Sequence, residues 1–291
     1  MAAGMLFRRL NFLPKDAHKG INAWILYLAM PAVSFTYLPH IKWSADLLFP
    51  MLAPVVMFFG AWVYFRFYSA HSSISKPTIA GLTLAGGISN ASFLGFPMVA
   101  AFYSEKDIAI AVICDQVGFT LLATVGIALA INASQEQRPS PKLFFKKILS
   151  FPAFWSCTLA LILPRYINIS PLDPFFAKLA GTVAPLALFS IGLQLKFKGY
   201  KQELKRISVT LFYKLMIAPA IGILIALAFH LRGIITQVTI FEMAMPPLMS
   251  AGIVADQYKL NPQLANLVVG IGLLVGIATA SCWWLVLQYF G

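Results

Sequence analysis

Three ionisable residues lie inside long apolar segments of this 291-residue chain: Asp115, Lys214 and Glu242. A charged side chain at the centre of a bilayer costs about 2.5 to 3.5 kcal/mol on insertion scales, so such residues are functional candidates. Asp115 could hold a proton or a sodium ion, or support neighbouring helices through hydrogen bonds. Lys214 could offset the charge of an anion, with Glu242 as its natural partner. The alternatives are a purely structural ion pair between the two, or a Lys214 side chain that extends to the basic connection 196–206.

A second set of candidates lies in two apolar segments that proline interrupts together with glycine or polar residues. Six residues there could contact a bound anion: Ser89, Asn90, Ser92, Pro97, Pro246 and Pro247. A helix broken inside a membrane frees backbone groups that lipid cannot satisfy, so the break has to line a wet or ligand-filled cavity. The N-terminus of a half-helix would then offer donors and a positive dipole end to an anion. For Asn90 the alternative is a hydrogen bond to a neighbouring helix, and for the serines it is close packing.

The composition predicts an all-α polytopic membrane protein. Of the residues, 59% are hydrophobic and 11% charged, and the mean hydropathy is +0.79, so lipid is the main solvent. The net charge of +12 does not indicate a nucleic-acid partner, because Lys and Arg lie in short clusters between apolar runs. The three cysteines and four histidines form no C-x-x-C or H-E-x-x-H motif, so we expect no disulfide framework, metal site or cofactor.

Helical spans of about 20 apolar residues account for most of the chain. We expect nine, near residues 21–38, 45–68, 77–103 (interrupted), 107–132, 148–164, 174–195, 207–231, 234–256 (interrupted) and 263–289. Of the 22 basic residues, sixteen fall in one set of alternate connections. Because Lys and Arg accumulate on the cytoplasmic side, the N-terminus is predicted to be cytoplasmic and the C-terminus external, in an inner or plasma membrane.

The chain also repeats itself. Residues 28–35 resemble residues 182–189, and the Leu-Ala-Pro of 52–54 resembles the Ile-Ala-Pro of 217–219, each followed by an interrupted segment. The paired spans are five apart, an odd number, so the two copies run in opposite directions. Such inverted repeats are typical of transporters with a site near the midplane. Three parts result: a first inverted repeat (1–133), a cytoplasmic linker (134–147) and a second inverted repeat (148–291).

Three stretches resemble the auxin efflux carrier family, which contains bacterial malonate-type carriers and the plant PIN auxin exporters. They are residues 87–97, 111–116 and 244–258, and the likeness runs from about Arg8 to the C-terminus. The resemblance implies ten spans in two inverted five-span repeats, split into a scaffold and a transport domain. The two broken helices would cross near the middle, as in sodium/proton antiporters and bile-acid transporters.

The resemblance also implies a function and a binding residue. We expect a secondary transporter of a small organic anion that works by alternating access, with protons or sodium ions as the coupling ion, and a homodimer is possible. Asn90 matches an asparagine that contacts substrate in such families. The chain departs from the family in having only residues 1–7 where a full first span normally stands. Either the true start lies upstream or the first repeat is shortened.

Two rival functions remain open at this stage. A receptor with a transporter fold would bind its ligand without flux. An intramembrane serine hydrolase would use Ser89 as nucleophile and His230 as base. This second rival lacks the glycine that should follow the serine, and His230 falls near the end of a span. Malonate, malate-like acids and indole acids all suit a broken-helix anion site, so the substrate stays open.

Overall fold

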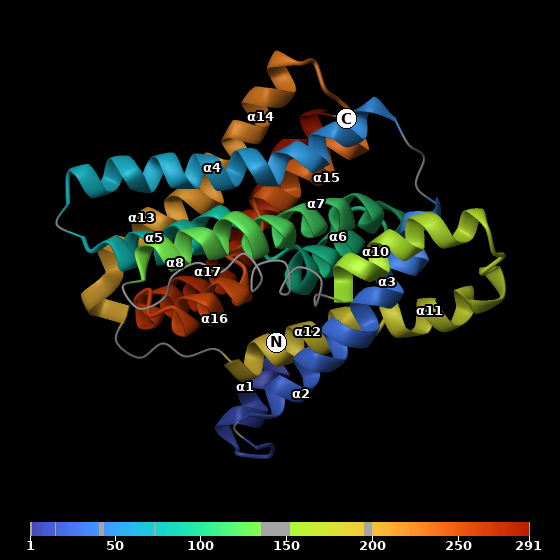
Figure 1. The fold of residues 1–291 in the computed structure, drawn as a ribbon, viewed down its shortest axis with the longest axis horizontal. Helices are drawn as coiled ribbons and strands as arrows, with labels where there is room; N and C mark the ends of the chain where they lie inside the picture. Colours follow the sequence, from blue (N-terminus) through green and yellow to red (C-terminus); the bar gives the residue numbers. More distant parts are fainter. Residues whose placement is uncertain are drawn as a thin grey trace.

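The structure is a computed structural model that describes residues 2–14, 16–40, 44–72, 74–134, 152–194 and 200–290. These residues form helices joined by short turns, with one isolated β-bridge and no named strand among them (Figure 1). The prediction of an all-α protein is confirmed. The predicted linker 134–147 lies, apart from Ser134, outside the described residues.

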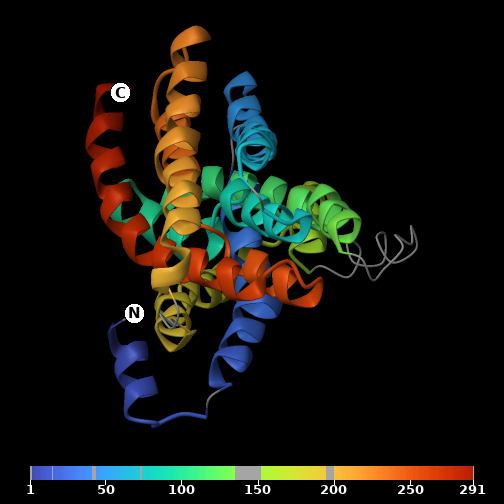
Figure 2. The same ribbon diagram turned by 90° about the vertical axis from the view of Figure 1, so that its left-hand side faces the viewer.

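The helices form two packed groups, seen from two sides in Figures 1 and 2. The first group comprises α1 (Ala2–Arg9), α2 (Ala17–Trp24), the π-helical turn η1 (Ile25–Ala29), α3 (Met30–Tyr37), α10 (Pro152–Ile162), α11 (Asp173–Ala180) and α12 (Val183–Gln194). In it, α3 packs on α10 and α11, and α12 packs on α1 and α2.

The second group holds both interrupted helices. It comprises α4 (Leu48–Ala70), α5 (Lys76–Gly87), η4 (Ala91–Gly95), α6 (Phe96–Phe102), α7 (Ile108–Leu121), η6 (Leu122–Gly126), α8 (Ile127–Ala133), α13 (Leu204–Phe212), η10 (Tyr213–Ile217), α14 (Ala218–Ala228), α15 (Ile234–Met243), α16 (Met249–Gln257) and α17 (Pro262–Leu287). Helix α4 packs on α5, α7 and α15, and α16 packs on α17. The two groups meet where η4 and α7 contact α12 and α3.

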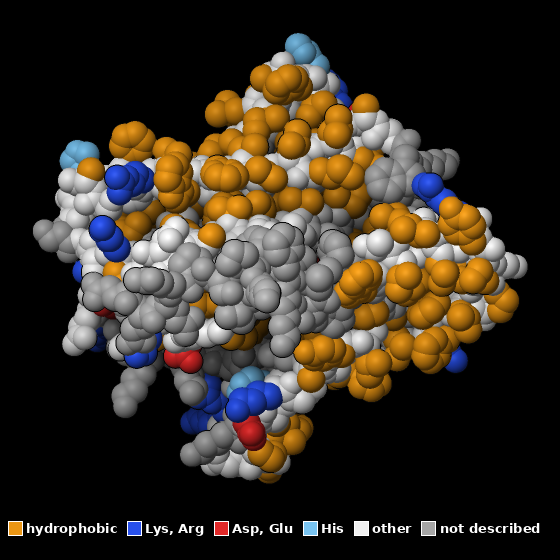
Figure 3. All heavy atoms as spheres, viewed as in Figure 1, with side chains coloured by type: hydrophobic (Ala, Val, Ile, Leu, Met, Phe, Trp, Pro, Cys, Tyr) orange, Lys and Arg blue, Asp and Glu red, His pale blue; other side chains and the backbone are white. Residues whose placement is uncertain are grey.

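The outer surface of both groups is apolar. Six helical segments of the described chain are long and apolar enough to cross a membrane: 17–40, 45–70, 105–133, 170–190, 201–228 and 262–290. The halves 91–102 and 234–243 of the interrupted helices are shorter. Figure 3 shows hydrophobic side chains spread over α4, α14 and α10–α11. Trp62 and Phe67 of α4 and Leu224 of α14 are exposed. Such a surface is suited to lipid and confirms a multi-pass membrane protein.

Three prolines follow closely after locally widened helical turns. The π-helical turns η1, η4 and η10 each stop two residues before a proline, namely Pro31, Pro97 and Pro219. Proline has no N–H and its ring crowds the carbonyl four residues earlier, and a wider turn at that point relieves both defects. Pro54 lies inside α4, which continues through it.

Candidate functional site

The two interruptions touch each other through their backbones. Between α5 and η4 the chain is extended, and so is the stretch between α15 and α16. The Asn90 N–H donates to the carbonyl of Pro246 with an N···O distance of 2.8 Å, and the Leu248 N–H donates to the carbonyl of Ile88 over 3.1 Å. Ser89 and Pro247 lie opposite each other in an antiparallel bridge between these two bonds. Each interruption therefore supplies hydrogen-bond partners for backbone N–H and C=O groups of the other, which have no partner within their own helix.

Helix α17 packs closely against the second interruption. A Cβ on Gly272 would lie 2.7 Å from the Cδ of Pro247, and a Cβ on Gly276 would lie 2.7 Å from the Cβ of Pro246. The missing side chains of these glycines allow α17 to press directly on the two prolines.

Lys214 lies beside this bridge with its side chain fully buried. Its Nζ donates to the carbonyl of Met243 over 2.6 Å and to the Oγ of Ser89 over 2.8 Å, and it lies 3.3 Å from the Sδ of Met57. The Ser89 hydroxyl in turn donates to the carbonyl of Glu242 over 2.7 Å. The last carbonyls of a helix have no partner within that helix, and a cation there is favourable. Lys214 and Ser89 thus cap the C-terminal end of α15.

Glu242 does not share that contact. Glu242 is 1% exposed, and neither carboxyl oxygen has a hydrogen-bond partner among the described residues. Within the described ranges, the ion pair present is Arg206–Glu203 at 2.9 Å, so Lys214 and Glu242 are not directly paired. Nor does Lys214 extend to the basic connection, because it is buried at the bridge. The Glu242 carboxyl instead lies against Gly95, where an added Cβ would come within 2.8 Å of the carboxyl carbon.

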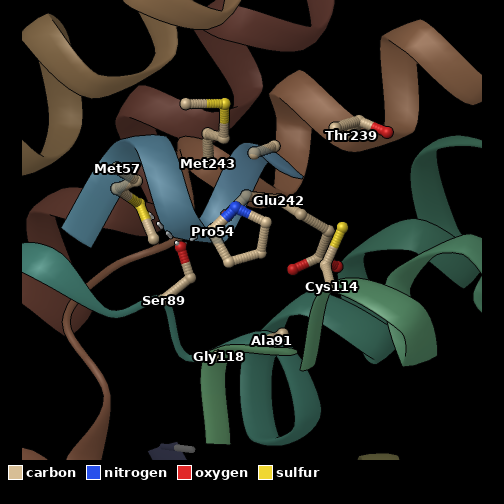
Figure 4. Close-up of a pocket in the computed structure, with 10 residues that line it drawn as sticks. Pro54, Met57, Ser89, Ala91, Cys114, Gly118, Thr239, Glu242 and Met243 are labelled. Atoms are coloured by element: carbon tan, nitrogen blue, oxygen red, sulfur yellow. Dashed lines mark hydrogen bonds between the residues drawn. The ribbon is translucent and has the colours of Figure 1, made fainter. Parts of the chain in front are cut away.

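A small cavity lies beside Ser89 and Glu242. It is lined by residues of α4, α7, α15 and the first interruption, including Met57, Ser89, Cys114 and Glu242 (Figure 4). The volume of the cavity is about 20 Å³. A cavity of roughly 10 to 15 Å³ holds one buried water molecule. In this conformation the cavity therefore suits water, and a dicarboxylate requires the helices to move apart.

A second polar cluster lies around the start of η4. The backbone N–H of Ser92 donates to Oδ1 of Asp115 over 3.1 Å, so the anion nearest this half-helix N-terminus is the protein's own carboxylate. Five buried polar atoms here have no hydrogen-bond partner: Asn90 Oδ1 and Nδ2, Ser92 Oγ, Asp115 Oδ2 and Gln116 Nε2. Buried polar groups are normally paired with protein or water, so this cluster is a candidate for contact with a polar ligand.

A model of the family described as "Membrane transport protein" matches residues 1–284. The chain belongs to the membrane transport protein family. This match confirms the resemblance to auxin efflux carriers. An "Uncharacterized transporter" of Methanothermobacter thermautotrophicus is 25% identical, over 98% of this chain and 94% of its own. A "Putative malonate transporter" of Rhizobium meliloti is 23% identical over 96% of this chain and 89% of its own length.

Not every predicted site residue of this family member lies at the bridge. Ser89, Asn90, Pro246 and Pro247 do, whereas the half-buried Pro97 lies in the first turn of α6, beyond η4. The unwound stretch covers residues 88–90, so the expectation of a break extending to Pro97 is wrong, because the π-helical turn keeps 91–95 helical.

The residues of the rival hydrolase do not meet. His230 is exposed just past the end of α14, while the hydroxyl of Ser89 bonds to Lys214 and to a backbone carbonyl. Asp256 is exposed near the end of α16 and lies away from the bridge.

Proposed function

We propose that this protein is a secondary transporter that moves a small organic anion across a cytoplasmic membrane and binds it where the two interrupted helices cross. The observation that carries the proposal is the pair of backbone hydrogen bonds between the interruptions, with the buried ammonium of Lys214 beside them. Irregular backbone at membrane depth occurs where it is buried in protein or lines a cavity. Interrupted helices in matching positions of two halves are a typical transporter site.

The charges near the crossing support an anionic substrate. Lys214 places a buried ammonium beside the crossing, and the amide of Asn90 offers donors that no described residue uses. Asp115 acts as a positioning residue, because its carboxylate holds the N-terminal end of η4. A carboxylate bound near Asn90 would therefore find donors and a compensating charge within one polar region.

The packing supports alternating access. The group with both interrupted helices touches the other group through η4 and α7, next to the polar cluster. We expect the interrupted-helix group to move as a transport unit against α1–α3 and α10–α12 as a scaffold. The inverted repeat inferred from the sequence gives this motion two related end states, one open to each side. The small cavity fits a closed state between them.

The substrate class follows from chemistry and from one relative. The "Putative malonate transporter" aligns with nearly the whole chain, which makes a short dicarboxylate the first substrate to test. The distribution of basic residues supports a cytoplasmic N-terminus and an external C-terminus.

Counterflow in proteoliposomes tests the proposal. Vesicles loaded with malonate, malate or indole-3-acetate should take up the same labelled acid, for at least one of the three. Asn90→Leu should abolish this exchange. The substitution removes no side-chain hydrogen bond, and the backbone bond to Pro246 stays, so the variant should fold. Asn132→Leu is the matched control, because Asn132 is exposed on α8.

Two results would overturn the proposal. Exchange by Asn90→Leu at the wild-type rate would remove the crossing from the mechanism. Thermal stabilisation of the wild type by one of these acids, without exchange, would identify a receptor that binds without transport.

A further inference from the structure

We propose that Glu242 carries the coupling proton: an organic anion binds beside Lys214 only while the Glu242 carboxyl is protonated, so that anion and proton cross together. This inference rests on the proposed transport function and names its coupling ion. It follows from the position of one buried carboxyl group in the cavity at the crossing (Figure 4).

The Glu242 carboxyl is buried without any bond that would stabilise its charge. Both oxygens are enclosed and unpartnered, and the space they occupy exists because residue 95 is a glycine. An ionised carboxylate in such a place is strongly unfavourable unless a cation or donors accompany it. The nearby ammonium of Lys214 is already bonded to Met243 and Ser89. The closed conformation is therefore the conformation in which Glu242 holds a proton.

The charged surroundings of Glu242 contain one cation and one other acid. Lys214 and Asp115 act electrostatically on it, and the thiol of Cys114 on α7 lines the same cavity. From α4 the cavity receives the uncharged Pro54 and Met57, and α14 and α17 carry no charged residue. The other charged residues on elements packed against α15 are exposed or lie at the surface: Asp46, Arg66, Glu105, Lys106 and Asp107.

This balance makes anion binding depend on the proton. With Glu242 ionised, an arriving carboxylate meets two negative groups and one positive group, and Glu242 competes with it for Lys214. With Glu242 protonated, the positive charge of Lys214 is available to the substrate. Glu242 takes its proton from water on the loading side and returns it to water on the releasing side. Anion affinity should therefore fall as pH rises.

Sodium fits this place poorly. Hard cations are held by several oxygen ligands. Apart from Glu242, the side-chain oxygens lining the cavity belong to Ser89 and Thr239. The first accepts a hydrogen bond from Lys214, and the second donates to the carbonyl of Ile235 over 2.6 Å. The ammonium 2.8 Å from Ser89 would also repel a second cation.

Titration calorimetry of the full-length protein with malonate tests the inference. Binding heats measured in buffers of different protonation enthalpy give the number of protons taken up per malonate bound. Above neutral pH, in the range where the wild-type Kd weakens with pH and Glu242 is therefore ionised in the ligand-free protein, the wild type should take up about one proton per malonate. Glu242→Gln should take up close to none, since its amide cannot titrate. Glu105→Gln makes the same change at an exposed position and should behave as the wild type. The number of protons taken up per malonate bound does not depend on how much affinity Glu242→Gln retains.

The outcomes separate the two levels of the proposal. If the wild type neither binds nor exchanges malonate or the other acids, the transport function itself is overturned. If it binds malonate without proton uptake at every pH from neutral upward, or if Glu242→Gln takes up the same proton, only the role of Glu242 is overturned. If Glu242→Gln binds no malonate, the pH dependence of the wild-type Kd tests the inference instead. Above neutral pH malonate is fully ionised, so any remaining pH dependence comes from the protein. The Kd should weaken up to tenfold per pH unit, and a pH-independent Kd contradicts the inference.

Discussion

Replacing Ser89 by alanine should destabilise the protein measurably, because one hydroxyl connects three elements at the crossing. Its Oγ donates to the carbonyl of Glu242 over 2.7 Å and accepts from Lys214 over 2.8 Å. The hydrogen bond from the charged Lys214 contributes about 1.5 to 3 kcal/mol. The bond to the Glu242 carbonyl contributes about 0.5 to 1.5 kcal/mol, because that carbonyl keeps a 3.2 Å bond from the Met245 N–H. Water can enter the adjoining cavity and recover part of this loss. We therefore expect a net loss of about 2 to 4 kcal/mol in the free energy of unfolding.

Thermal unfolding of purified protein in one detergent measures this loss. Scaled from soluble domains, it corresponds to a fall in Tm of about 4 to 8 °C. The matched control is Ser69→Ala, whose hydroxyl donates to the carbonyl of Arg66 at the exposed end of α4, and it should change stability by less than about 0.5 kcal/mol. Equal Tm values for the two variants would refute the reasoning, since the crossing would then contribute nothing to stability.

Two further substitutions test the packing and the capping. Gly276→Ala places a Cβ 2.7 Å from Pro246 and should cost about 1 to 3 kcal/mol through overpacking, whereas Gly20→Ala meets no atom within 4 Å and should be neutral or stabilising by up to about 1 kcal/mol in the same unfolding assay. Asp115→Ala leaves a buried backbone N–H at the start of η4 unpaired and should cost about 1 to 3 kcal/mol, while Asp256→Ala on the exposed end of α16 should stay within about 0.5 kcal/mol. Equal stabilities within either pair would contradict the corresponding contact.

Much of the helical framework could be predicted from the sequence, because lipid imposes strict lengths on apolar segments. Six of the nine predicted spans correspond to helical segments of the described chain that are long and apolar enough to cross a membrane. The two interrupted spans are made of shorter helices, and the span 148–164 lies partly outside the described residues. The burial of Lys214 also follows from its isolation in an apolar run.

The remaining features depend on how segments far apart in the chain meet. Whether Lys214 bonds to Glu242 or to the carbonyl of Met243 depends on the rotation of η10 against α15, which no local pattern encodes. The role of Gly272 and Gly276 depends on α17 lying against the prolines. The shorter first interruption has a local cause: a π-helical turn absorbs Pro97 without ending the helix. Glycine and proline thus serve different purposes at different positions: Gly276 lets α17 approach Pro246, whereas Pro97 is accommodated within a helix.

The most direct test of the central claim is an experimental structure of the protein in a lipid nanodisc with malonate, or with whichever acid undergoes exchange. Our account predicts ligand density between the two interruptions, within contact distance of the Asn90 amide and close to the ammonium of Lys214. Ligand density elsewhere, with the bridge between Ser89 and Pro247 unchanged and no ligand beside it, would contradict the account.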